Sequence, residues 1–298
     1  MSGEDQTATL RKLAESVVVA LRPPRRRVVA VTGGKGGVGK STVAVNLAVS
    51  YARRGTRTLA LDGDLGMADL NLLLGLAPER SLLDVLNGCP VEDVLVEAHG
   101  IHLLPALNGS HHLANLDAAA RRKLMEAIDL LGERFEALIV DVPAGIGASA
   151  MELAAAAPEI VVVATPEPLS LADAYACLKV LATRHGVTRA FLLPNAVRSP
   201  SQADEIVSRL SALVDRFLGI GLSPLPPVPW DPSVGSAAAA GVPVVLHSPD
   251  SPASRALLRT ARRIDGLLQP VDRPSVLPRF LHGALPGGSP EMASKEAR

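Results

Sequence analysis

The sequence has few cysteines, few aromatic residues and no excess of charge of either sign. Its 298 residues include two cysteines, 2% aromatic side chains, and 30 basic against 30 acidic residues. The cysteines, Cys89 and Cys177, form no metal-ligand spacing and fit a reducing cytoplasm. Nucleic acid binding needs clustered cations or stacking platforms, and both are scarce. We therefore expect a cytoplasmic protein with no specific nucleic acid partner.

Long hydrophobic runs are also missing. The N-terminus is acidic and polar rather than a signal peptide. The longest apolar runs are strand-sized, well below the roughly 20 residues of a membrane span. Because 48% of the residues are apolar, the chain can still bury a sizeable core. Pro, Gly, Ser and charged residues dominate the tail, 269–298, and we expect disorder after residue 285.

The apolar pattern predicts an N-terminal helix followed by an α/β domain. Apolar residues recur at three- and four-residue steps over 1–22, and Pro23 ends that pattern. After a basic linker, 23–27, short β-branched runs alternate with longer Ala/Leu-rich stretches over 28–268. This alternation predicts a mainly parallel sheet with helices on both faces. Strands are expected at 27–32, 57–62, 101–106, 135–142, 159–165 and 189–195, and helices at 41–54, 117–132, 169–184, 201–217 and 252–268.

The stretch TGGKGGVGKST, residues 32–42, contains a phosphate-binding loop. It fits G-x-x-x-x-G-K-[ST] between a predicted strand and a predicted helix, which is the context that the motif requires. Glycines let backbone N–H groups turn around phosphate oxygens, and the following helix directs its positive end at the same anion. We expect Lys40 to reach the β- and γ-phosphates, Ser41 to ligate Mg²⁺ and Thr42 to bond a phosphate oxygen. The predicted site comprises Gly34, Lys35, Gly36, Gly37, Val38, Gly39, Lys40, Ser41 and Thr42.

Three aspartates at strand ends fit the same site. Asp141 ends the apolar run ALIVD, and LDGDLG places Asp62 and Asp64 at the end of another predicted strand. Open parallel sheets bind ligands at the carboxyl ends of their strands. We therefore expect Asp141 and Asp62 at the metal and Asp64 beside the nucleotide. An ordinary polar turn is the competing interpretation of Asp62 and Asp64.

The base can be predicted from a late strand. GTP-specific enzymes carry Asn-Lys-x-Asp there, whereas this chain has LLPNAVRS, with Asn195 but no Lys-x-Asp. ATP is thus the expected nucleotide. The Asn195 amide can meet the adenine edge with both a donor and an acceptor.

Several segments together resemble one family. KGGVGKST resembles the deviant Walker A loop of the MinD/ParA class of ATPases, with the added signature lysine at Lys35. Residues 61–88 and IVDVPAGIG (139–147) are similar to the switch I and switch II segments of the MinD-like flagellar number regulators called FlhG, FleN or YlxH. PEPLSLADAYACLK (166–179) resembles their Asp-Ala-Tyr run, and DQTATLR (5–11) resembles their activator helix. The resemblance covers about residues 4–268.

This resemblance implies an ATPase that forms an ATP-dependent homodimer. Lys35 would cross to the nucleotide of the partner chain and, with Lys40, stabilise transition-state charge. Asp64 would position the attacking water, Asp62 would contact the signature lysine, and Asp141 would hold Mg²⁺ through water. A solvated loop lysine is the competing interpretation of Lys35. The adenine would be lined by Asn195, Pro229, Trp230 and Asp231.

The resemblance also implies partners for both ends of the chain. Gln6 would insert near the nucleotide of a signal-recognition-type GTPase, FlhF, and Thr7 departs from the alanine usual there. A helix docked on its own domain is the competing interpretation. Near the C-terminus, 275–286 would make weak peripheral contact with the inner face of the membrane, unless it packs on the domain or stays disordered. The predicted activator motif includes Asp5, Gln6, Leu10 and Arg11.

The resulting hypothesis is an ATP-driven dimerisation switch that regulates flagellar number or placement. Flagellar C-ring proteins or a flagellar transcription regulator are further expected partners by resemblance. Three alternatives stay open: a ParA-like partitioning ATPase that binds DNA non-specifically, an iron–sulfur carrier on the same fold, and a scaffold that binds ATP without hydrolysis. The first needs a basic surface, for which only Arg22 to Arg27 qualifies. The second needs paired cysteines.

Overall fold

The computed structural model describes residues 27–63, 69–81, 84–85, 87–105, 131 and 134–267. The activator helix with Gln6, most of the linker, Asp64, most of the predicted helix at 117–132, and the tail with its 275–286 segment lie outside this part.

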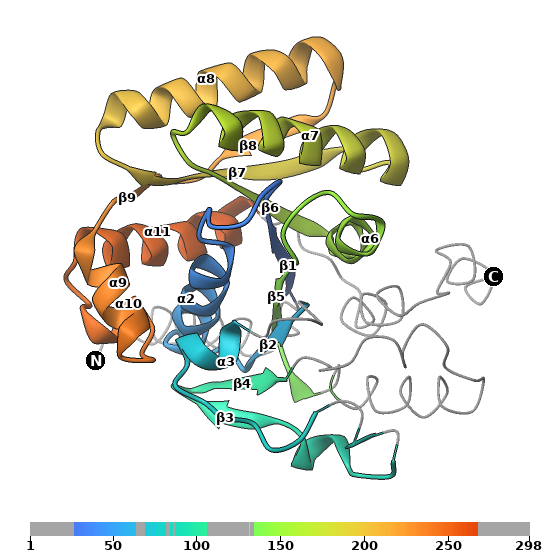
Figure 1. The fold of residues 1–298 in the computed structure, drawn as a ribbon, viewed down its shortest axis with the longest axis vertical. Helices are drawn as coiled ribbons and strands as arrows, with labels where there is room; N and C mark the ends of the chain where they lie inside the picture. The colour runs from blue at the N-terminus through green and yellow to red at the C-terminus, as the bar shows by residue number, and fades with distance from the viewer. Residues whose placement is uncertain are drawn as a thin grey trace, which may run out of the picture.

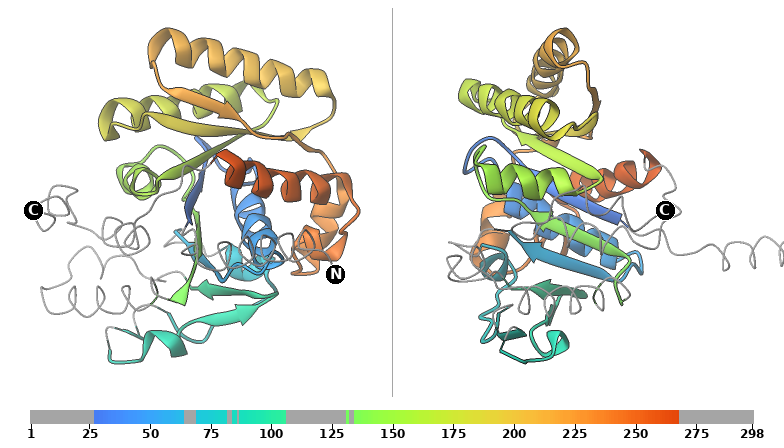
Figure 2. Two further views of the ribbon diagram at one scale, coloured as in Figure 1. Left: turned by 180° about the vertical axis from the view of Figure 1, so that it is seen from behind. Right: turned by 90° about the vertical axis from the view of Figure 1, so that its right-hand side faces the viewer.

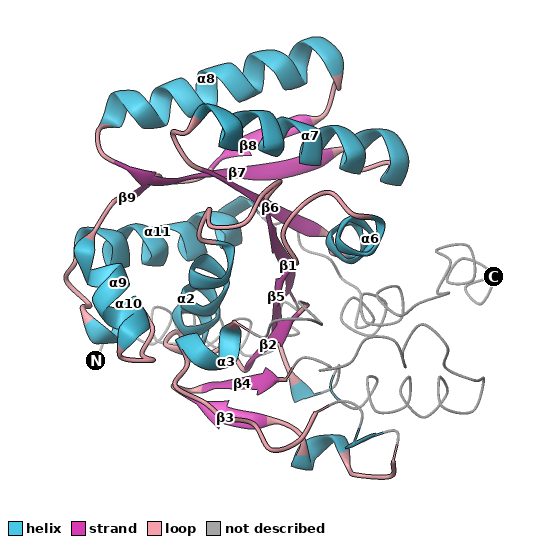
Figure 3. Ribbon diagram, in the orientation of Figure 1, coloured by secondary structure: helices cyan, strands magenta, loops and turns pink. Residues whose placement is uncertain are grey.

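A mainly parallel sheet forms the centre of the domain (Figures 1 and 3). Across the described residues its strand order is β3-β4-β2-β5-β1-β6-β7-β8, and a short ninth strand, β9, also pairs with β7. All pairings are parallel except that of β3 with β4 at one edge. The strands are β1 (Arg27–Thr32), β2 (Thr58–Asp62), β3 (Val96–Ala98), β4 (Ile101–Leu104), β5 (Ala137–Asp141), β6 (Glu159–Ala164), β7 (Arg189–Val197), β8 (Gly221–Pro224) and β9 (Val228–Pro229).

The six predicted strands are confirmed, each within two residues of its expected bounds. They are buried apolar runs, which is the pattern of a parallel sheet covered on both faces. The sequence did not predict β3, β8 or β9. These strands have two to four residues each, too few for a periodic signal, and two of them contain proline.

Helices cover both faces of the sheet (Figure 2). Four predicted helices are confirmed, and proline at the first turn of α7, α8 and α9 supplies a backbone angle suited to a helix start. None of the helices in the described part has the length and apolar character needed to cross a bilayer. The helices are α2 (Lys40–Ala52), α3 (Leu70–Leu73), α6 (Ala148–Ala156), α7 (Pro168–His185), α8 (Pro200–Phe217), α9 (Pro232–Ala239), α10 (Val244–His247) and α11 (Pro252–Leu267), with a 3-10 turn, η1 (Val91–Asp93).

Two hydrophobic cores lie on opposite faces of the sheet, because successive strand residues point to opposite sides. In β1, Val28 and Ala30 join the core under α6, α7 and α8. Their neighbours Val29 and Val31 join the core under α2, α9, α10 and α11. This three-layer arrangement fixes the carboxyl ends of β1, β2, β5, β6 and β7 along one edge.

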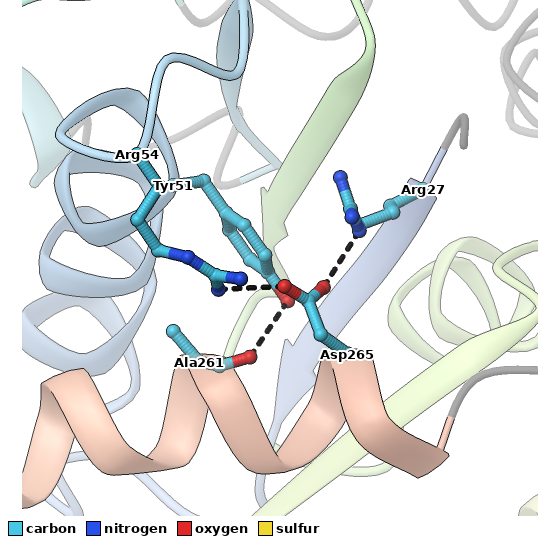
Figure 4. A network of polar contacts seen from close by, with 5 residues as sticks. All are labelled: Arg27, Tyr51, Arg54, Ala261 and Asp265. Carbon is cyan, nitrogen blue, oxygen red and sulfur yellow. Dashed lines mark hydrogen bonds and ion pairs between the residues drawn. The ribbon is translucent and has the colours of Figure 1, made fainter. Parts of the chain in front are cut away.

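The opposite edge is held by Asp265 of α11 (Figure 4). Its carboxylate lies 2.7 Å from Arg27 Nε of β1 and 2.6 Å from Arg54 Nη1, just after α2. These contacts act as ion pairs rather than aligned hydrogen bonds. The Tyr51 ring lies under the Arg27 guanidinium, 5.3 Å from its centroid, and its hydroxyl donates to the carbonyl of Ala261. Burial, reinforced by the nearby Asp265 charge, raises the pKa of Tyr51.

Asp265→Ala should destabilise the domain by about 3 kcal/mol, because it leaves the largely buried Arg27 cation without its counter-ion. Glu205→Ala is the matched control, since it removes an exposed i,i+4 ion pair with Arg209 on α8 and should cost less than about 0.5 kcal/mol. Chemical denaturation gives both free energies of unfolding. Equal losses in the two variants would contradict the anchoring role of Asp265.

Candidate nucleotide-binding site

The loop between β1 and α2 packs so closely on its surroundings that it needs glycine. Gly39 precedes α2 with φ of 92°, and a Cβ there would lie 2.4 Å from Asn195 Nδ2. A Cβ on Gly34 would lie 2.0 Å from the carbonyl oxygen of Asp173 in α7. Both positions therefore exclude any side chain. Lys40, Ser41 and Thr42 occupy the first turn of α2, whose positive end is where an anion binds best.

Asn195 holds this loop from β7, the second strand from β1 in the sheet. Its Nδ2 donates a hydrogen bond of 2.8 Å to the carbonyl of Val38. The next residue, Ala196, has φ of 55°, an uncommon value for a residue with a side chain. One amide hydrogen of Asn195 is thus engaged by the loop, which amends the predicted adenine contact. Its Oδ1 acceptor and second amide hydrogen remain for a base.

Two carboxylates meet beside the loop. Asp62 and Asp141 are the last residues of β2 and β5, they pair in register, and both are buried. Asp62 Oδ2 accepts a hydrogen bond of 3.1 Å from the backbone N–H of Leu70. The predicted neighbourhood of Asp141, Lys40 and Ser41 is present, since both of the latter act on the Asp141 charge. Asp64, the predicted water-positioning residue, lies outside the described residues.

Burial raises the pKa of Asp141 to about 7. The hydrogen bond with the Ser41 side chain and the Lys40 ammonium lower it, while the charges of Asp62 and Asp69 raise it. Burial and the neighbouring carboxylates raise the pKa of Asp141 more than Ser41 and Lys40 lower it. A further cation at this site would therefore stabilise the ionised carboxylate.

The donor set fits Mg²⁺. Asp141 Oδ1 is buried with no hydrogen-bond partner among the described residues. Ser41 adds a hydroxyl and Asp62 a second carboxylate, and Mg²⁺ prefers such oxygen ligands combined with substrate phosphates. No group of three or more His, Cys, Asp or Glu side chains that could hold a metal occurs in the described part of the chain. A two-carboxylate site that relies on nucleotide phosphates is consistent with that.

Lys35 pairs with a carboxylate of its own chain. Its Nζ lies 2.5 Å from Glu167 Oε2, just before α7. The pair is partly exposed to solvent, and the cross-chain role of Lys35 stays a prediction. Lys40, by contrast, is buried.

The residues of the predicted adenine wall differ in role: Trp230 is exposed at the surface, whereas the Asp231 carboxylate bonds to the backbone of its own fold. Pro229 pairs with Val197 through β9, and Trp230 is exposed, with the Arg198 guanidinium 4.8 Å from its ring centroid. Asp231 instead has a framework role, because Oδ1 accepts from the N–H of Ser233 and Oδ2 from that of Ala253. Burial opposes ionisation of Asp231, but these donors, with the side chains of Ser233 and Ser251, lower its pKa overall.

The sequence did not point to two residues after β6 that contact the phosphate-binding loop. Glu167 pairs with Lys35, and Asp173 lies against Gly34. The sequence also did not point to Arg198, whose guanidinium lies over the ring of Trp230 in the predicted adenine wall. The run PEPLSLADAYACLK was singled out by resemblance alone, and a glutamate between two prolines was the signal that could have drawn attention to Glu167.

The fold and this edge of the sheet define a P-loop NTPase. A family model described as ParA: NUBPL iron-transfer P-loop NTPase matches residues 25–265. The antiactivator FleN of Pseudomonas aeruginosa is 39% identical over 241 residues, which are 80% of this chain and 86% of that protein. The flagellum site-determining protein YlxH of Helicobacter pylori is 32% identical over 188 residues, 62% of this chain and 63% of that one.

Among solved structures, the septum site-determining protein MinD of Pyrococcus horikoshii, complexed with Mg-ADP, matches with a TM-score of 0.62 and 28% identity. The match covers 81% of this chain and 97% of that one. The chain belongs to the ParA family of P-loop NTPases, within its MinD-like FleN and FlhG (YlxH) group. It is accordingly an ATPase whose cofactors are ATP and Mg²⁺.

Asp141→Asn should stabilise the nucleotide-free protein at pH 8. The pKa of Asp141 rises from 3.8 to about 7 on folding, so the folded chain binds the extra proton between these values. Stability is therefore lost as the pH rises toward 7, and the variant removes that loss. Thermal unfolding at pH 8 and pH 5 should show a gain in Tm at pH 8 that shrinks at pH 5.

With added Mg-ADP the wild type should have the higher Tm at pH 8. The variant lacks one metal ligand, so binding stabilises the wild type more. Asp204→Asn, an exposed aspartate on α8, should change neither result. A gain of the same size at both pH values would contradict the raised pKa.

Proposed function

We propose that this ATPase is an ATP-dependent dimerisation switch that regulates flagellar number or placement. The single observation that carries the switch is the separation of the two loop lysines. Lys40 is buried beside Asp141, whereas Lys35 lies at the rim in a pair with Glu167. These positions support the proposal that Lys40 serves the nucleotide of its own chain and Lys35 that of a second chain. The flagellar assignment rests on the names of the related FleN and YlxH proteins.

The proposed reaction is in-line attack of water on the γ-phosphate of ATP. When bound, Mg²⁺ neutralises charge on the phosphate oxygens. Lys40 contacts the same phosphate oxygens and stabilises charge that develops on them. Asp64 orients the water, and Ser41, Asp141 and Asp62 supply the oxygen ligands of the metal site. Asn195 keeps the loop in place from β7 during turnover.

Apolar side chains at the same edge support pairing of two chains. Ile146 in the loop after β5 is 47% exposed, and Leu169 at the start of α7 is 72% exposed. Both follow carboxyl ends of strands, as the nucleotide loop does. Two such edges that meet face to face would bury apolar surface and bring two triphosphates close together. A Lys35 cation from each chain would offset the repulsion between them.

The ends of the described chain support a separate place for other partners. The chain enters the domain at Arg27, the first residue of β1, and leaves it after Leu267, two residues beyond Asp265. The Arg27–Asp265 pair brings these points together at the edge opposite the nucleotide loop. We expect residues 1–22, with Gln6, to stimulate FlhF, and 275–286 to make weak membrane contact.

The alternatives gain no specific support. The DNA-binding hypothesis needs the basic linker, which includes Arg27. In this structure Arg27 pairs with Asp265 and lies against the Tyr51 ring. Cys177 is buried with its sulfur 3.9 Å from Met151 Sδ, and Cys89 lies 3.5 Å from Arg80 Nη1. Neither cysteine has a second thiol beside it for an iron–sulfur cargo.

Substitution of the two lysines should separate binding from dimerisation. Lys40→Ala should weaken ATP binding by about 10- to 100-fold, because a charge-assisted phosphate contact is lost. Lys35→Ala should leave ATP affinity of the single chain within about twofold and abolish ATP-driven dimers. Isothermal calorimetry measures the first effect and light scattering the second. ATP-driven dimers of Lys35→Ala would sink the proposed cross-chain role.

Gln6→Ala should remove stimulation of a signal-recognition-type GTPase while the ATPase rate stays unchanged. The glutamine amide can orient water or a phosphate oxygen, which alanine cannot. Phosphate release is measured for each enzyme with GTP or ATP alone, and a chain that lacks residues 1–22 serves as the second variant. If the Gln6→Ala and truncated chains still stimulate the GTPase fully, the N-terminal role is wrong. A salt-sensitive shift of plain duplex DNA would favour the partitioning alternative instead.

A further inference from the structure

The segment between β6 and α7, residues 165–167, holds Glu167 in a rigid backbone conformation. Pro166 and Pro168 flank it, and proline fixes its own backbone angle. The hydroxyl of Ser170 accepts a hydrogen bond of 2.9 Å from the N–H of Thr165, which closes the turn. The Leu171 N–H bonds back to the Glu167 carbonyl at 3.2 Å. The backbone of Glu167 is therefore fixed on both sides.

Lys35 is the movable member of the pair. It stands between two glycines, and a Cβ on Gly36 would meet nothing closer than 4.0 Å. The preceding glycine, Gly34, instead packs against Asp173 of α7. The loop is thus anchored on α7 just before Lys35, while the lysine side chain itself is held only by the Glu167 carboxylate among the contacts of the described residues.

We infer that Glu167 is a positioning residue, which holds the signature lysine on its own chain until ATP brings two chains together. In this position the Lys35 ammonium is directed at a carboxylate of its own chain, so the Glu167 charge competes with the phosphates of a second chain for the same cation. The pair therefore opposes dimerisation in the single chain, and two such pairs must break for each dimer. This inference rests on the proposed switch. It adds Glu167 as the group that helps to set the protein concentration at which dimers form.

The expected size follows from exposure. The side chains of Lys35 and Glu167 are 28% and 68% exposed, so water screens the pair. An exposed ion pair changes an equilibrium by up to about fivefold. Because a dimer breaks two pairs, Glu167→Gln should lower the protein concentration for half-dimerisation in ATP by about 3- to 25-fold.

A merely structural role predicts a different result. The Glu167 side chain makes no capping hydrogen bond to α7, so an amide of the same shape leaves the helix start intact. Glu167→Ser is a second variant, which introduces a favourable N-cap residue at this position. Both variants should bind ATP with unchanged affinity and unfold at a temperature no lower than that of the wild type, while the dimer equilibrium shifts.

Sedimentation velocity over a range of protein concentrations, with Mg²⁺ and a non-hydrolysable ATP analogue, tests the inference on the full chain. ADP is the nucleotide control. Glu205→Gln is the matched variant, because it breaks an exposed ion pair with Arg209 on α8 and should not shift the equilibrium. The difference between wild type and Glu167→Gln should shrink in high salt, which screens the same pair.

Failure of this inference and failure of the switch give different results. If Lys35→Ala stays monomeric but Glu167→Gln dimerises no more readily than wild type, the holding role of Glu167 is wrong and the switch stands. Weaker dimers of Glu167→Gln would overturn the inference as well, and would place the carboxylate in the dimer contact itself. ATP-driven dimers of Lys35→Ala would overturn the switch, and this role of Glu167 with it.

Discussion

The close approach of one glycine loop to strand β7 and helix α7 is the constraint on which this structure depends. At Gly39 the loop lies against Asn195, and at Gly34 it lies against Asp173. Neither position has room for a Cβ, so the loop takes its shape from the packed elements around it. Those elements are rigid because both faces of the sheet are covered by helices. A phosphate cradle made of backbone donors needs such rigidity, since preorganised donors bind an anion without reorganisation.

The same edge carries an electrostatic cost in the nucleotide-free chain. Asp62 and Asp141 are buried side by side, and the pKa of Asp141 lies near 7 despite Ser41 and Lys40. A cation with its nucleotide phosphates would offset that cost, and the free energy released would appear as ligand-dependent stability. Burial of a carboxylate such as Asp141, whose charge the fold offsets only in part, is typical of a site built for its ligand.

The sequence predicted the part of this architecture that depends on local pattern. Buried β-branched runs located six strands, and the spacing of Lys40 and Ser41 located the loop between β1 and α2. It could not predict β8 or β9, because strands this short are formed by pairing with β7 rather than by their own residues. It also did not predict the framework role of Asp231, whose carboxylate caps α9 at the next residue and accepts a hydrogen bond from Ala253 of α11. Long-range partners such as Glu167 for Lys35, 132 residues apart, leave no periodic trace.

The two regulated regions of the molecule occupy opposite ends of one short strand. β1 begins at the Arg27–Asp265 pair, where both terminal segments join the domain, and ends at the nucleotide loop. Six strand residues span roughly 20 Å, which separates Arg27 from the nucleotide loop by about that distance. In the proposed switch, nucleotide acts on the terminal segments through pairing of whole chains, which changes the number of segments in one assembly. Two weak segments held together act far more strongly than one, because the second binds at a high effective concentration. In the proposed switch, the exposed Glu167 carboxylate that holds Lys35 makes pairing of two chains the step most open to control.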